Sequence, residues 1–153
     1  MAEADGCEIW VAAGTYYPYP ESSTLDRDAT FMLRSGVDLY GGFAGREQNR
    51  SERDIETFIT FLSGDIDRNG ELDDGNVYHV VTGADDTVID GFTIIGGHAN
   101  HTDWSNLRSV GGGMFNDRTS PTVRNCTFSG NAASRNGGGM FTESASPTVT
   151  GCT

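Results

Sequence analysis

The chain has 153 residues and a formal charge of −12 at pH 7, which comes from 22 acidic and 10 basic residues. This balance argues against nucleic acid as a partner, because contacts to phosphate need clustered Lys and Arg. No apolar run approaches the length of a transmembrane helix, so we expect no membrane span. A chain of this length predicts one domain, residues 1–153.

The N-terminal half contains short apolar runs that predict strands. We expect these strands at residues 7–12, 30–33, 37–40, 58–62 and 77–82, and residues 87–95 begin a more regular pattern. The most highly charged segment, residues 45–56, lies between them. We expect it to be a solvated loop with surface ion pairs, with a short helix as the alternative.

Three tyrosines follow the first predicted strand and are interleaved with Pro18 and Pro20: Tyr16, Tyr17 and Tyr19. We expect them to cap the open end of the core, because the terminal repeats of a stacked fold are atypical. The alternative is a surface on which sugar rings stack. On that reading the three tyrosines are candidate ligand contacts, and carbohydrate is the candidate ligand.

Residues 65–76 resemble a calcium-binding loop, because residues 65–70 follow the pattern D-x-D-x-N-G. Oxygen atoms at alternate positions converge on one ion, since the glycine permits a sharp turn. The candidate ligands are Asp65, Asp67, Asn69, Asp73 and the carbonyl of Glu71. Asn76 stands where such a loop has a bidentate Glu, and no flanking helices are expected. The alternative to calcium is an acidic loop that holds no ion.

From residue 111 the chain nearly repeats itself with a period of 26 residues. Gly-Gly-Gly-Met-Phe at 111–115 returns at 137–141, and Ser-Pro-Thr-Val at 120–123 returns at 146–149. A fixed period in the twenties is typical of a solenoid. Apolar residues alternate with small polar ones, and none recur with the 3.6-residue period of a helix. We therefore predict an all-β parallel β-helix of about six coils, irregular over residues 1–86 and regular over 87–153.

The constant period predicts which residues touch. Equivalent residues of stacked coils lie about 4.8 Å apart, the spacing of neighbouring strands. Cys126 should therefore lie against Cys152, and Phe115 against Phe141. Packed reduced thiols are the favoured state of the cysteine pair. A disulfide is the alternative, because this spacing falls within the disulfide range.

Three residues of one repeat are predicted to point into the core: Val123, Cys126 and Phe128. Strict alternation cannot turn all three inward. We expect a bend at Asn125 to reset the alternation, because Asn tolerates the left-handed backbone region. A second bend is expected at Asn131.

The repeat extends backwards with one insertion. Residues 89–96 match residues 123–130 at an offset of 34, which is eight more than the period. The extra residues fall within 100–110, and insertions in solenoids become loops on one face, often the binding face. Trp104 is the candidate ligand contact in this loop. The alternative is that Trp104 folds back over the outer surface of the coil.

The repeats resemble a known family. Gly-Gly-Gly-Met at 111–114 and 137–140, together with Phe128-Ser129-Gly130-Asn131, is similar to the GGA-I and FxxN repeats of polymorphic outer membrane proteins. More broadly, the chain resembles large bacterial surface proteins built on right-handed parallel β-helix repeats. Similar upstream segments are residues 8–16, 36–45, 62–67 and 78–83. The resemblance implies a right-handed parallel β-helix, and such proteins are normally much longer.

The same resemblance implies an extracellular or cell-surface location. Residues 1–6 are polar and acidic, so we expect the secretion signal to lie outside this chain. A cytoplasmic location is the alternative.

We expect a non-catalytic structural or adhesive module that assembles end to end into a homo-oligomer or filament. No catalytic residue is assigned, because acidic pairs such as Asp85 and Asp86 usually point apart along a chain. The histidines also lack the spacing of zinc ligands. The alternative is a fragment of a carbohydrate-active enzyme, a polysaccharide lyase or hydrolase.

Overall fold

The computed structural model describes residues 6–18, 25–103 and 105–153. Within these residues the elements are β-strands, apart from two 3-10 turns, η1 (Arg50–Glu52) and η2 (Leu107–Ser109). The prediction of an all-β chain is therefore confirmed. Neither turn is long and apolar enough to cross a membrane.

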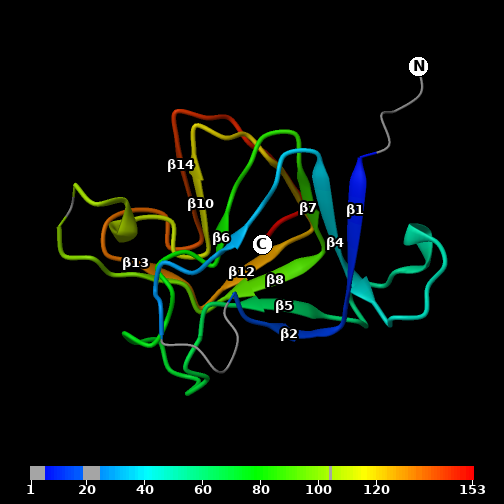
Figure 1. Ribbon diagram of the computed structural model, residues 1–153, viewed down its shortest axis with the longest axis horizontal. Coiled ribbons are helices and arrows are strands. Elements are labelled where there is room, and N and C mark those ends of the chain that lie inside the picture. The colour runs from blue at the N-terminus through cyan, green and yellow to red at the C-terminus, as the bar shows by residue number, and fades with distance from the viewer. Residues whose placement is uncertain (1–5, 19–24, 104) are drawn as a thin grey trace.

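Most of the described strands form three sheets, and every strand pairing within them is parallel (Figure 1). Sheet A contains β1 (Cys7–Ala12), β4 (Val37–Phe43), β7 (Val88–Asp90), β11 (Thr122–Arg124) and β15 (Thr148–Thr150). Sheet B contains β2 (Gly14–Tyr16), β5 (Thr60–Ser63), β8 (Phe92–Ile95) and β12 (Thr127–Ser129). Sheet C contains β3 (Phe31–Met32), β6 (Val81–Thr82), β10 (Met114–Asp117) and β14 (Met140–Glu143). The short strands β9 (His98–Ala99) and β13 (Ala132–Ala133) pair with each other.

The chain visits sheets A, B and C in turn and then starts again, so each pass forms one layer stacked on the last. This arrangement is compatible with a β-solenoid. Sheet A holds five strands and sheets B and C hold four each among the described residues, which is fewer than the predicted six coils. The difference arises because the layers have unequal lengths. Along sheet A, stacked residues are 30, 50, 34 and 26 residues apart: Cys7 on Val37, Leu39 on Ile89, Ile89 on Val123, and Val123 on Val149.

The predicted insertion is confirmed in size and place. Ala133 pairs with Ala99 at an offset of 34, whereas Asn136 pairs with Val110 at an offset of 26. The eight extra residues therefore lie between Ala99 and Val110. They form a loop that contains η2 and leaves the strand register intact on both sides.

The core lies between the three sheets. Its buried members come from several layers: Leu33, Leu62, Val77, Val80, Val81, Ile89, Phe92, Ile94, Met114, Val123 and Cys126. Val123 and Cys126 are buried as predicted, and Phe128 is half-buried and packs against the same cluster. Asn125 has a φ of 48°, which confirms the predicted bend between the two buried residues.

The second predicted bend was wrong by one residue. Gly130, with a φ of 61°, adopts the left-handed conformation in place of Asn131. The Asn131 side chain instead links two layers, because its Nδ2 donates to the Ile94 carbonyl at 2.8 Å and its Oδ1 accepts from the Gly97 N–H at 2.9 Å. The bend falls on the residue without a Cβ, and the asparagine supplies hydrogen bonds.

The predicted stacking contacts are present. The rings of Phe115 and Phe141 are 6.3 Å apart and tilted by only 4°. The Cys126 N–H donates to the Cys152 Sγ at 3.4 Å. Of the predicted strand at 77–82, only β6 (Val81–Thr82) pairs as a strand, although Val77 and Val80 are buried.

The charged segment 45–56 is mostly loop, as predicted, and it contains one short 3-10 turn, η1. One of its ion pairs, Arg53 with Asp90, is mostly buried and is not the expected surface pair. Arg50 forms an ion pair with Glu8 on β1, and Arg53 forms one with Asp90 on β7. These pairs hold the loop against sheet A.

Candidate functional site

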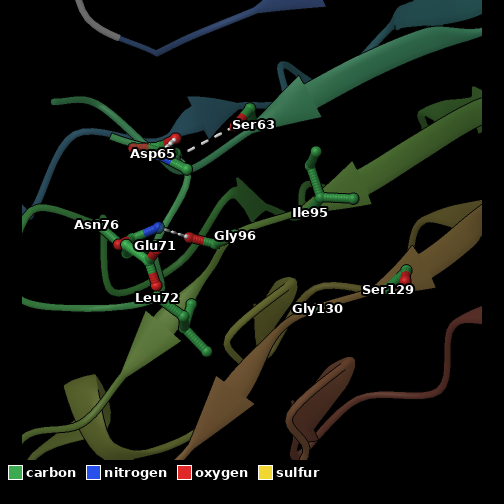
Figure 2. A pocket seen from close by; sticks show the side chains of 10 residues that line it. Ser63, Asp65, Glu71, Leu72, Asn76, Ile95, Gly96, Ser129 and Gly130 are labelled. Carbon is green, nitrogen blue, oxygen red and sulfur yellow. Dashed lines mark hydrogen bonds between the residues drawn. The ribbon is translucent and has the colours of Figure 1, made fainter. Parts of the chain in front are cut away.

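An open groove of about 410 Å³ lies where β5, β8 and β12 end (Figure 2). The residues at the strand ends are Ser63, Ile95 and Ser129, which are stacked in register across three layers. Asp65, Glu71 and Leu72 of the acidic loop form the opposite wall. The groove therefore presents a ladder of small and apolar side chains beside two carboxylates.

The acidic loop is held in shape by hydrogen bonds to its own carboxylates. Asp65 accepts from the N–H groups of Asn69 and Gly70, at 3.2 and 2.9 Å. The Asn69 amide nitrogen donates to both Asp67 and Asp73, each at 3.0 Å. Two of the five predicted calcium ligands, Asp67 and Asp73, therefore accept from the side-chain amide of a third, Asn69.

The crowding of these carboxylates changes the titration of one of them. Partial desolvation raises the pKa of Asp67, and the neighbouring Asp65 and Asp73 raise it further. Close negative charges favour protonation of one member of a group.

Hydrogen-bond donors separate the carboxylates of the acidic loop. Among residues 6–18, 25–103 and 105–153, no group of three His, Cys, Asp or Glu side chains is arranged to hold an ion. Amide and backbone donors fill the positions between the carboxylates. Calcium binding at Asp65, Asp67, Asn69, Glu71 and Asp73 thus stays a prediction.

Asn76, which stands in place of the expected bidentate Glu, has a structural role that the sequence did not reveal. It is fully buried, and its Nδ2 donates to the Gly96 carbonyl at 2.8 Å on the next layer (Figure 2). Its Oδ1 accepts from the Asp73 N–H at 2.9 Å. A bridge between Asp65 and Asn76 closes the base of the loop. The loop is therefore anchored to the core from its last residue.

The predicted aromatic contacts are only partly within the described residues. Tyr16 is exposed, and its hydroxyl donates to the Ala12 carbonyl at 3.1 Å. Tyr17 lies under the Arg68 guanidinium at 4.4 Å and lines an open apolar cavity of about 300 Å³ at the first layer. Tyr19 and Trp104 lie outside the described residues. A shared sugar-stacking surface stays a prediction.

Arg27, which no sequence pattern indicated, connects three loops by hydrogen bonds. Arg27 donates to the Asn76 carbonyl at 2.7 Å, to Asp74 at 2.9 Å and to Asn100 at 2.7 Å. Asn100 and then Arg27 lower the pKa of Asp74. The partners are 47 to 73 residues from Arg27 in the sequence, so no local pattern could indicate them.

The insertion loop packs against the rest of the fold through Tyr78, whose ring lies close to two arginines. Arg27 lies 4.2 Å from the Tyr78 ring centre, and Arg108 lies 5.5 Å from it. Arg108 also forms an ion pair with Asp28, with an N–O distance of 2.6 Å. The predicted contact loop is thus bound to the first layer and to the acidic loop.

The adjacent carboxylates of Asp73 and Asp74 have separate partners. Asp73 accepts from the Asn69 amide and the Gly75 N–H, whereas Asp74 binds Arg27 and Asn100. His79 stacks on Phe115 at 4.9 Å, and its Nδ1 lies 3.0 Å from the Gly111 carbonyl. Burial lowers the pKa of His79. Asp73, Asp74 and His79 each have partners within the fold.

Comparison of the chain with protein-family models, with curated proteins and with solved structures finds no match.

Proposed function

We propose that this chain is a right-handed parallel β-helix module of a bacterial surface or secreted protein, related to the proteins with polymorphic outer membrane-type repeats. We propose a structural or adhesive role for it, with extension by end-to-end stacking. The parallel layers and the 26-residue offset between β10 and β14 support this reading. The three sheets begin in the same layer, with β1, β2 and β3, and at the other end sheet A extends one strand, β15, beyond the last strands of sheets B and C.

The two ends of the stack offer complementary surfaces. Among the described residues, β1, β2 and β3 each pair on one side only, and so do β15, β12 and β14 at the other end. Unpaired strand edges recruit further strands. A second copy would place the end that carries β1, β2 and β3 against the end of the first copy that carries β15, β12 and β14. Such a head-to-tail contact propagates into a filament unless its rotation closes.

The surroundings of Gly113 and of its equivalent, Gly139, support end-to-end stacking. A Cβ on Gly113 would collide with the Gly139 carbonyl of the next layer and would lie 2.9 Å from the Asn131 Nδ2. Gly139 is the equivalent residue one repeat later, yet a Cβ there would meet only Phe128, at an ordinary 3.4 Å. Glycine is thus required at 113 by a stacked layer. The glycine at position 139 leaves space for the backbone of a further layer, such as the first layer of a second copy.

A pair of alanine variants tests the proposal. Gly113→Ala should lower stability by about 1–3 kcal/mol, because it overpacks two layers. Gly139→Ala should leave the melting temperature of the monomer unchanged or slightly higher, since Ala restricts the unfolded chain. Light scattering over a concentration series should show rods for the unmodified protein and monomers for Gly139→Ala.

Two results would contradict end-to-end stacking. One is an unmodified protein that stays monomeric at high concentration. The other is a Gly139→Ala variant that assembles as well as the parent. Circular dichroism of both variants provides the control for folding.

The groove favours a second candidate, a module that cleaves polysaccharide. Its length across β5, β8 and β12 suits an extended chain, and Glu71 supplies a carboxylate on its wall. Release of new reducing ends from a polysaccharide panel, abolished by a chelator, would support an enzyme. Binding without cleavage would support adhesion.

A further inference from the structure

We propose that Cys126 and Cys152 form a thiol–disulfide site, which reacts with a low-molecular-weight disulfide and links two successive layers covalently. This proposal is independent of the role proposed above. It rests on the register of the two layers, on the positions of the two thiols and on their unequal burial.

The register holds on both sides of the cysteines. Arg124 pairs with Thr150, and the Asn125 N–H donates to the Thr150 carbonyl at 3.0 Å. On the other side, the Thr153 N–H donates to the Cys126 carbonyl at 3.0 Å. Residues stacked in this way lie about 4.8 Å apart. That separation falls within the range of about 4.4–6.8 Å between the Cα atoms of disulfides.

The two thiols point in the same direction. The Cys126 Sγ lies 3.1 Å from the Arg124 carbonyl and 3.8 Å from the Ile89 carbonyl. The Cys152 Sγ lies 3.5 Å from the Thr150 carbonyl and 3.7 Å from the Val123 carbonyl. These are equivalent atoms one layer apart: Arg124 with Thr150, and Ile89 with Val123. The sulfur atoms are therefore stacked.

The environments of the two thiols give them different roles. Cys126 is 1% exposed, whereas Cys152 is half-buried and open to a reagent. The hydrogen bond from the Cys126 thiol lowers the pKa of Cys152 to about 6. The same contact, followed by burial, raises the pKa of Cys126. Cys152 is thus the attacking thiolate, and Cys126 is the thiol that completes the bond.

The reaction with glutathione disulfide balances in two steps. The Cys152 thiolate attacks one sulfur of the reagent, a mixed disulfide forms, and one glutathione leaves as a thiolate. Cys126 then attacks the Cys152 sulfur, its proton passes to the departing sulfur, and the second glutathione leaves. Two protein thiols are oxidised to one disulfide, and one disulfide of the reagent is reduced to two thiols.

The test uses the full chain at a concentration where light scattering shows a monomer. The protein is incubated with glutathione disulfide at neutral pH, alkylated, digested and analysed by mass spectrometry. We expect a cross-linked peptide that joins Cys126 to Cys152. Cys7 is the internal control, because it is exposed on β1 and should accumulate as the mixed disulfide with glutathione.

Two further measurements assign the roles. In Cys126→Ala, the mixed disulfide should persist at Cys152, because the completing thiol is gone. In the unmodified protein, alkylation of Cys152 should reach half of its limiting rate at a pH of about 6. A rate that still rises steeply above pH 8 would contradict the assignment of Cys152 as the thiolate.

Three results for the unmodified protein would overturn the proposal. In the first, Cys126 and Cys152 both stay reduced while Cys7 reacts. In the second, Cys152 keeps its bound glutathione although Cys126 is present. In the third, Cys152 forms its disulfide with Cys7. These results need no variant to fold.

Discussion

Replacing Arg53 by Met is expected to destabilise the protein by about 3 kcal/mol. The Arg53 Nη2 lies 2.9 Å from the Asp90 Oδ1, and the two side chains are only 17% and 7% exposed. The Arg53 Nη1 also donates to the carbonyls of Gly41 and Asp90, at 3.3 and 3.2 Å. This arginine therefore binds the charged loop to two layers of sheet A at once.

The magnitude follows from what the variant leaves behind. Met retains most of the apolar stem, so the main loss is the charge and its hydrogen bonds. Breaking a buried ion pair costs about 3–5 kcal/mol, because the remaining charge is uncompensated. Asp90 keeps one donor, the Asn125 Nδ2 at 2.9 Å, which places the expected loss at the lower end. The double variant Arg53→Met with Asp90→Asn should recover most of the stability.

The assay is urea unfolding followed by circular dichroism, under reducing conditions. The matched control is Arg118→Met, because Arg118 pairs with Asp117 at 3.0 Å but is 77% exposed. An exposed pair of this kind contributes about 0–1 kcal/mol. A loss below about 1 kcal/mol for Arg53→Met would refute the reasoning. A double variant no more stable than the single one would refute it as well.

Two other properties can be measured on the same protein. Calcium should raise the melting temperature if it binds only the folded acidic loop, and changing Asp65 and Asp67 to Asn should remove the effect. Identical melts in calcium and in chelator would exclude that site. Burial lowers the pKa of His79 from its ordinary 6.5, so the unfolded state binds more protons below that pH and stability should fall as the pH drops. His79→Phe should lack this part of the pH dependence as the pH falls below 6.5, whereas an unchanged slope would contradict it.

The regular part of the fold could be predicted because stacked neighbours are also equivalent residues in the sequence. The offset of 26 between Phe115 and Phe141, and the offset of 34 between Ile89 and Val123, are visible in the order of the amino acids alone. A parallel ladder turns such an offset directly into a contact. The bend at Asn125 could be predicted for a similar local reason, since few residues tolerate that backbone conformation.

The loops could not be predicted in the same way. Arg27 binds segments that share no sequence pattern with it. Asn76 donates a hydrogen bond to the Gly96 carbonyl of the next layer, which no sequence pattern indicates either. The number of layers was overestimated because the period was extended into the half of the chain with long insertions. The groove depends on where the acidic loop folds relative to β5, β8 and β12, and only tertiary contacts determine that.

The unequal layer lengths have a consequence for how the chain folds. The strand pairings made by β8, β10, β11, β12 and β15 join residues 26 to 34 positions apart. The pairings of β2 with β5, β3 with β6 and β4 with β7 join residues 46 to 50 apart. Nearly doubling a closed loop costs about 0.6 kcal/mol of chain entropy. Pairing should therefore start most readily in the C-terminal layers and between β1 and β4, whose paired residues are 30 apart, and the long connections that close the second layer should form last.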